Sequence, residues 1–252
     1  MKRYFLLLIA MLGGVVLSLA EMNIYVYKKD GTIEKYEASE VDSIGFVDKE
    51  NTHNGYEYVD LGLSVKWATM NVGAIYPEDY GDYFAWGETE PKLVYDWDSY
   101  KWCDGNHKSL TKYCANSDYG VVDNKNVLEF DDDVASVAFG GEWRIPTIAE
   151  CEQLLDENNC LWTWTTQNNV KGFLVTSKIN GNTIFLPAAG FCSSEVNGIG
   201  NFGAYCVNSI AYAGQVQISS NCYYLRFHSN AKGLDNQGRC VGICIRPVLS
   251  TK

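Results

Sequence analysis

The sequence predicts an α+β protein with two main helices and short antiparallel sheets, preceded by an N-terminal β-hairpin. Three observations lead to this prediction. Two helix-start patterns lie within residues 131–155, the segments on both sides alternate apolar and polar residues over short lengths, and residues 21–48 contain a hairpin pattern of their own. Residues 56–252 show neither an obvious repeat nor a low-complexity tract, so we treat them as one domain.

The first twenty residues have the pattern of a secretory signal peptide. Lys2 and Arg3 precede an apolar run over residues 4–19, and Ser18 and Ala20 supply the small residues of a cleavage site. The run is shorter than the roughly 20 residues that cross a bilayer. We therefore expect a cleaved bacterial export signal, no membrane insertion afterwards, and a mature protein that is periplasmic, located at the cell surface or secreted.

The hairpin is predicted at the start of the mature chain. Residues 23–27 alternate, Lys29-Asp30-Gly31 supplies turn chemistry, and residues 33–36 resume an extended pattern. Residues 41–46 are expected to add a strand or to pack beside the hairpin. A segment of this size buries too little surface to fold independently, so it docks on the domain after it or acts as a spacer, and the polar residues 49–55 form a linker.

Both helices are predicted from their first residues. The acidic run 131–133 suits the positive end of a helix dipole, which places the first helix from Val134. Thr147 and Glu150 have the spacing of a capping box for the second helix. Its apolar residues share one face, namely Ile148, Cys151, Leu154 and Leu155.

Most of the remaining chain is expected to form strands. Residues 161–165 alternate, and residues 170–178 are joined to 183–186 through Asn180-Gly181, a dipeptide typical of tight hairpin turns. Two late segments are also predicted strands, residues 223–227 and 241–248. A long aromatic loop is expected over residues 77–102.

The charge balance argues against nucleic acid as a partner. Acidic residues number 31 against 20 Lys and Arg, a net charge of −11 that repels phosphate backbones and anionic membranes. The 7 Trp, 17 Tyr and 10 Phe suit either a binding surface that stacks on sugars or a loop-rich core. We expect Trp67, Trp86 and Trp143 in the core.

Nine cysteines in an exported chain suggest disulfides, although an odd number leaves at least one thiol free or paired between chains. The locally plausible pairs are Cys103 with Cys114 and Cys151 with Cys160. The late cysteines at positions 240 and 244, with only three histidines in the chain, match no closed zinc pattern. We expect neither a metal site nor a cofactor.

No motif supports catalysis. Residues 198–203 fit the string G-x-G-x-x-G, but strand or loop is expected after the last glycine, where a dinucleotide site needs a helix. Acidic clusters such as residues 131–133 suit helix starts or solvated loops, and no G-x-S-x-G setting for a serine nucleophile is present. We therefore expect a protein that is not an enzyme.

Four segments carry recognisable strings: residues 58–71 (YVDLGLSVKWATMN), 82–91 (DYFAWGETEP), 141–147 (GEWRIPT) and 245–248 (IRPV). Together and in this order they resemble the Fibrobacter succinogenes major paralogous domain family, over about residues 56–249. That family is similar to the C-type-lectin-like fold shared with formylglycine-generating enzymes. The resemblance implies this fold for residues 56–252 and assigns no activity.

Two features of the resembling families do not transfer. Formylglycine-generating enzymes bind copper through a late pair of cysteines, but Cys240 and Cys244 lie four apart on a predicted strand, about 13 Å from each other by strand rise. Glu90-Pro91-Lys92 is similar to the sugar-binding Glu-Pro-Asn of calcium lectins, but Lys92 replaces the ligand Asn. Neither copper nor calcium binding is expected.

The sequence thus predicts an exported, non-catalytic binding domain for an extracellular glycan or protein. Two alternatives stay open: an oxidoreductase similar to formylglycine-generating enzymes, and a receptor whose C-terminal region is diversified by a retroelement. The expected ligand surface lies between Phe191 and Arg239. Its candidate contacts are Tyr205, Asn208, Tyr212, Tyr223, Arg226, His228 and Asn236, where aromatic faces would stack and polar groups would orient the ligand.

Overall fold

The computed structural model describes residues 23–27, 32–41 and 51–250, and the chain divides into two units, Met1–Val47 and Asp48–Lys252. In the first unit β1 (Asn23–Tyr27) pairs with β2 (Ile33–Glu37) in antiparallel register, and a short 3₁₀ turn, Ala38–Glu40, comes after β2. The two strands of the predicted hairpin are therefore confirmed. The signal peptide, the turn at 29–31 and most of the third predicted piece lie outside the described residues.

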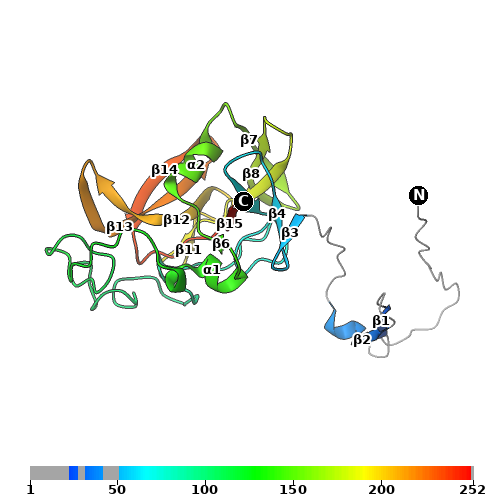
Figure 1. The fold of residues 1–252 in the computed structure, drawn as a ribbon, viewed down its shortest axis with the longest axis horizontal. Helices are drawn as coiled ribbons and strands as arrows, with labels where there is room; N and C mark the ends of the chain where they lie inside the picture. Colours follow the sequence, from blue (N-terminus) through cyan, green and yellow to red (C-terminus); the bar gives the residue numbers. More distant parts are fainter. Residues whose placement is uncertain (1–22, 28–31, 42–50, 251–252) are drawn as a thin grey trace, which may run out of the picture. The chain divides into compact units, whose positions relative to one another are not determined.

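The second unit is mostly β-sheet, so the predicted α+β, C-type-lectin-like fold with two main helices is wrong (Figure 1). The two α-helices of its described part, α1 (Val134–Phe139) and α2 (Ile148–Leu155), have only six and eight residues. The fold class was mispredicted for two reasons. The first is local: Gly140 and Gly141 both adopt positive φ, 66° and 62°, which ends α1 after six residues. The second reason is that the late strands are much longer than predicted: one covers residues 216–228, where only 223–227 was expected.

The predicted helix starts are nevertheless confirmed. The Asp133 carboxylate accepts hydrogen bonds from the backbone N–H groups of Ala135 and Ser136 and so caps α1. Thr147 and Glu150 form the capping box of α2, with each side chain bonded to the backbone of the other residue. Such caps stabilise a helix by about 1 kcal/mol, which matters for helices this short.

A five-stranded sheet joins distant parts of the second unit. Its order is β3 (Thr52–His53), β4 (Tyr56–Val59), β5 (Val65–Ala68), β15 (Val248–Ser250) and β6 (Trp143–Arg144). β3 lies inside the predicted linker. The predicted strand over 241–248 is wrong, because Gly242, Ile243 and Cys244 form single bridges to three different segments, and only Val248 joins a sheet.

A three-stranded meander comes after α2. It consists of β7 (Cys160–Gln167), β8 (Val170–Ser177) and β9 (Thr183–Pro187), paired antiparallel in that order. The predicted strands and the predicted hairpin through Asn180-Gly181 are confirmed; Gly181 has φ +80°, a conformation that glycine adopts without strain. β9 is an edge strand of this sheet.

The longest strands form a second meander, β12 (Phe202–Ala213), β13 (Val216–His228) and β14 (Ala231–Gly238). Two register shifts near Ile210 mark irregular pairing between β12 and β13. Tyr205 and Leu225 face a core shared with α2, which packs against β12 and β14, whereas Cys206 and Tyr224 face a second core shared with α1. A sheet buried on both faces carries a near-continuous apolar pattern, so β12 lacked the alternation that predicts a strand.

Two buried arginines bind the irregular parts of the unit together. Arg246, 1% exposed, donates to the Asn71 side chain and to the carbonyls of Ala68, Thr69 and Phe185. Arg239, fully buried, donates to the Tyr100 hydroxyl and to three backbone carbonyls, those of Lys112, Tyr113 and Ser219. The long segment between β5 and α1 is thus held without regular strands. The three tryptophans predicted in the core, Trp67, Trp86 and Trp143, are each 1% exposed.

Candidate functional site

The seven predicted contact residues do not form one site. Tyr223 lies opposite Asn236 on one face of the β12–β13–β14 sheet, and Arg226 and His228 lie on the other face, because successive side chains of a strand alternate. Tyr205 is 2% exposed and donates its hydroxyl to the Pro187 carbonyl. It therefore belongs to the core and not to a surface.

The others have local partners. Arg226 makes an ion pair with Asp235, with 2.9 Å between Nε and Oδ2. Asn208 is 8% exposed and accepts a hydrogen bond from Ser209, and the Tyr223 hydroxyl bonds to the backbone of Tyr212. Of the seven, Tyr212 lines a surface pocket, at the end of the β12–β13 hairpin.

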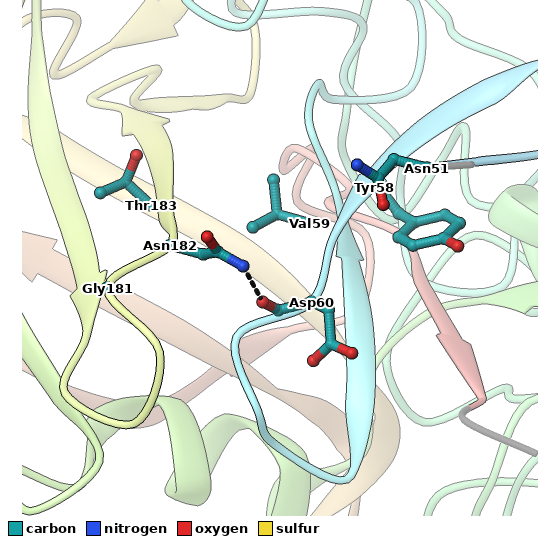
Figure 2. A pocket seen from close by; sticks show the side chains of 7 residues that line it. All are labelled: Asn51, Tyr58, Val59, Asp60, Gly181, Asn182 and Thr183. Carbon is teal, nitrogen blue, oxygen red and sulfur yellow. Dashed lines mark hydrogen bonds between the residues drawn. The ribbon is translucent and has the colours of Figure 1, made fainter. Parts of the chain in front are cut away.

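The structure places a polar pocket elsewhere, between the end of β4 and the start of β9 (Figure 2). We call it the Asp60 pocket. Its volume is about 370 Å³, within the lower part of the range of small-ligand sites. It is lined by Asn51, Tyr58, Val59, Asp60, Gly181, Asn182 and Thr183.

Two turns that meet at Asp60 build this pocket. The Asp60 carboxylate accepts a hydrogen bond from the backbone N–H of Gly62, 2.7 Å away, which fixes the turn after β4. The side-chain amides of Asn180 and Asn182, from the turn before β9, both donate to the Asp60 carbonyl, at 2.9 and 2.8 Å. Figure 2 shows the second of these bonds. These hydrogen bonds hold the two turns in place without a ligand.

A smaller, more apolar hollow adjoins the Asp60 pocket. Its volume is about 180 Å³, it shares Val59 and Thr183 with the Asp60 pocket, and it extends to Pro77, Leu174 and Phe185. On the polar side, the Lys66 ammonium donates to the Tyr58 hydroxyl at 3.2 Å and lies 4.3 Å from the ring centroid. A ligand here meets hydrogen-bonding groups at one end and aliphatic carbon at the other.

The chemistry of the Asp60 pocket suits binding. Its side chains supply one carboxylate, two amides, a phenol and a hydroxyl, which together can donate to and accept from a ligand rich in hydroxyl groups. Glycoside hydrolysis normally uses two carboxylates facing each other, and Asp60 is the single acid in the lining. Sequence reasoning missed the site because its two halves lie about 120 residues apart.

The nine cysteines form no disulfides, and the two late ones lie apart. All nine cysteines fall in the described ranges and are free, so the predicted pairs Cys103–Cys114 and Cys151–Cys160 are absent. Cys240 and Cys244 belong to different clusters of buried residues, and the Cys244 thiol donates to the Tyr80 carbonyl. Burial raises the pKa of Cys240 to about 11, which keeps this thiol protonated near neutral pH.

The structure also places two other segments that the sequence singled out, the G-x-G-x-x-G string and Lys92. The G-x-G-x-x-G string runs directly into β12, not into a helix, which confirms that it lacks the setting of a dinucleotide site. The Lys92 ammonium bonds to Glu88 and to the Ser99 carbonyl. In the described part of the chain, no three His, Cys, Asp or Glu side chains gather as a metal site would require.

Neither α1 nor α2, nor any other helix of the described residues, combines the length and apolar character of a membrane span. No family model, curated protein or solved structure matches this chain. The resemblance to the Fibrobacter succinogenes major paralogous domain family therefore stays a prediction.

Proposed function

We propose that this chain is an exported, non-catalytic binding protein that takes an uncharged, hydroxyl-rich ligand, such as a glycan, in the Asp60 pocket. The observation that carries the proposal is the pocket itself: an open hollow of ligand size, lined by Asp60, Asn51, Asn182, Tyr58 and Thr183. Carboxylate and amide groups of this kind bond to vicinal sugar hydroxyls as acceptors and donors at once.

The stiffness of the site supports binding. The hydrogen bonds from Asn180 and Asn182 to Asp60 exist in the protein alone, so a ligand does not have to order the two turns. Preorganisation of this kind lowers the entropic cost of association. The adjoining hollow at Pro77 and Leu174 adds apolar surface for the carbon face of a sugar ring.

The charge of the chain disfavours an anionic ligand. The chain carries a net charge of −11, and Asp60 is the one carboxylate in the lining of the pocket. Anionic ligands would be repelled. The export pattern in residues 1–20 is consistent with a ligand outside the cytoplasm.

A glycan array probed with the whole secreted chain tests the proposal, with titration calorimetry on the strongest binder as the second step. Asp60→Asn keeps an oxygen for the Gly62 N–H and removes the negative charge, so we expect at least a tenfold loss of affinity with little change in stability. Glu152→Gln, the same chemical change at an exposed position on α2, is the matched control. No saturable binding to any glycan, or equal affinity for both variants, would overturn the assignment.

A further inference from the structure

The three-stranded sheet β7–β8–β9 has two edges, and the protein occupies them differently. At the outer side of β9 the Phe185 carbonyl accepts from the Arg246 guanidinium at 3.0 Å, and the Pro187 carbonyl accepts from the Tyr205 hydroxyl at 2.7 Å. Pro187 also has no N–H to offer. The other edge is β7, which is paired on one side, with β8. We call residues 160–167 the β7 edge.

Three residues of the β7 edge point their backbone N–H and C=O groups away from β8. The turn between the two strands is Asn168-Asn169, with positive φ at both residues, so Gln167 beside it exchanges hydrogen bonds with β8. Bonded and non-bonded residues then alternate along the strand. The groups of Trp162, Trp164 and Thr166 therefore face outward, and within the described residues no hydrogen bond reaches them.

The β7 edge lacks the features by which edge strands usually avoid other chains. Residues 160–167 (CLWTWTTQ) contain no charge, no proline and no glycine, and they pair with β8 without a register shift. β14, an edge strand of the same length, carries Lys232, Asp235 and two glycines. Charges, prolines and bulges are the usual protection against pairing with a further strand. A regular, uncharged edge of threonines and aromatic residues is thus a template for another strand.

The β7 edge is accessible and already ordered. Leu161 is 53% exposed, and Thr163 and Thr166 are exposed as well. On the side of the sheet that faces the core, Trp162 and Trp164 are half-buried and pack against the core cluster, and the Trp162 indole N–H is bonded to α2. A strand can therefore add to this edge without a change in the strand that receives it.

We propose that the β7 edge pairs with the β7 edge of a second copy of this chain, antiparallel about a twofold axis at Trp164. In this register Trp164 of one copy lies opposite Trp164 of the other, and Trp162 of each copy lies opposite Thr166 of the other. These are the residues whose N–H and C=O groups face outward, so each pair exchanges both of its N–H···O bonds. The two sheets join into one continuous sheet.

The strand is complementary to itself in this register. Besides the pair of Trp164 rings, Thr163 of each copy lies opposite Thr165 of the other, and both aromatic pairs and threonine pairs across strands stabilise antiparallel sheets. Two chains with a net charge of −11 repel each other, and the uncharged β7 edge lets them meet without bringing like charges together. Assembly stops at two copies, because the outer edge of β9 is already occupied.

Sedimentation velocity of the whole chain over a range of concentrations tests the proposal, and we expect the mass to double as the concentration rises. Hydrogen exchange followed by NMR then locates the interface. The N–H groups of Trp162, Trp164 and Thr166 should exchange at least tenfold more slowly in the dimer, whereas those of Thr163 and Thr165, already bonded to β8, should not change. A single copy at every concentration up to the millimolar range, or a dimer without this pattern of exchange, would overturn the inference.

Two variants test the geometry of the pairing. Thr166→Pro removes an outward N–H and keeps the bonds to β8, so the dissociation constant of the dimer should rise at least tenfold. Thr163→Lys places two like charges on one face of the joined sheet and should raise the constant several-fold, even if the proline variant folds poorly.

Thr111→Lys is the matched control, because it makes the same change in net charge at an exposed position in the loop before α1. It should leave the dissociation constant unaltered, and a dimer as tight in Thr163→Lys as in Thr111→Lys would refute the pairing. The inference does not depend on the Asp60 pocket, to which the opposite edge strand, β9, contributes Thr183. Asp60→Asn should accordingly have no effect on dimerisation.

Discussion

Replacing Asp133 should separate two roles of one buried carboxylate. One oxygen accepts from the N–H groups of Ala135 and Ser136 at the start of α1, and the other accepts from the N–H of Ile145, beyond the helix, at 2.9 Å. Loss of an N-cap costs about 0.5–2 kcal/mol, and a buried N–H left unpaired costs about 1–3 kcal/mol. We therefore expect Asp133→Ala to lower the free energy of unfolding by about 2–4 kcal/mol.

Asp133→Asn distinguishes the two roles. Its oxygen can still cap α1, but its NH₂ group then faces the N–H of Ile145, so the expected loss is only about 1–3 kcal/mol. Urea unfolding monitored by tryptophan fluorescence measures both variants, with an unchanged dependence on urea concentration as the check on two-state behaviour. Asp131→Ala, at an exposed neighbour, should stay within about 0.5 kcal/mol of the parent. Equal losses for Ala and Asn would refute the division of roles.

Three further outcomes are expected. Burial raises the pKa of Asp133 from 3.8 to about 6, so between about pH 4 and 6 the folded state holds a proton that the unfolded chain has released. The free energy of unfolding should therefore fall as the pH rises through this window. This pH dependence should be missing in Asp133→Asn. Arg246→Met leaves the carbonyls of Ala68 and Phe185 without their donor, and thermal unfolding should show a loss of about 3 kcal/mol or more. Iodoacetamide without reductant should label nine thiols in the unfolded chain. In the native protein Cys103, the most exposed of the nine cysteines, should react first. Seven labelled thiols or fewer in the unfolded chain would reveal a disulfide.

Local signals in the sequence predicted local structure well. The capping box of Thr147 and Glu150 involves residues three apart, and the turn at Asn180-Gly181 is set by the two residues themselves, so neither needs information from the rest of the chain. The same signals do not say how far an element runs. α1 begins where its acidic start predicts but ends after six residues, at Gly140.

The sheets and the pockets depend on contacts between distant segments, which the pattern of residues does not reveal. β12 is buried on both faces and so lacks alternation. The Asp60 pocket needs Asn182 to bond to Asp60, 122 residues earlier. One error was avoidable: Tyr223 and Arg226 are an odd number of residues apart, and on a strand that spacing alone places them on opposite faces.

The contacts of Arg239 have a consequence for how this protein can change. The guanidinium grips main-chain oxygens of Lys112, Tyr113 and Ser219, and backbone oxygens are the same whatever side chain a residue carries. A substitution at Lys112 should therefore leave the bond between its carbonyl and Arg239 in place. A single buried arginine thus fixes the path of the backbone at these three residues through bonds that do not involve their side chains.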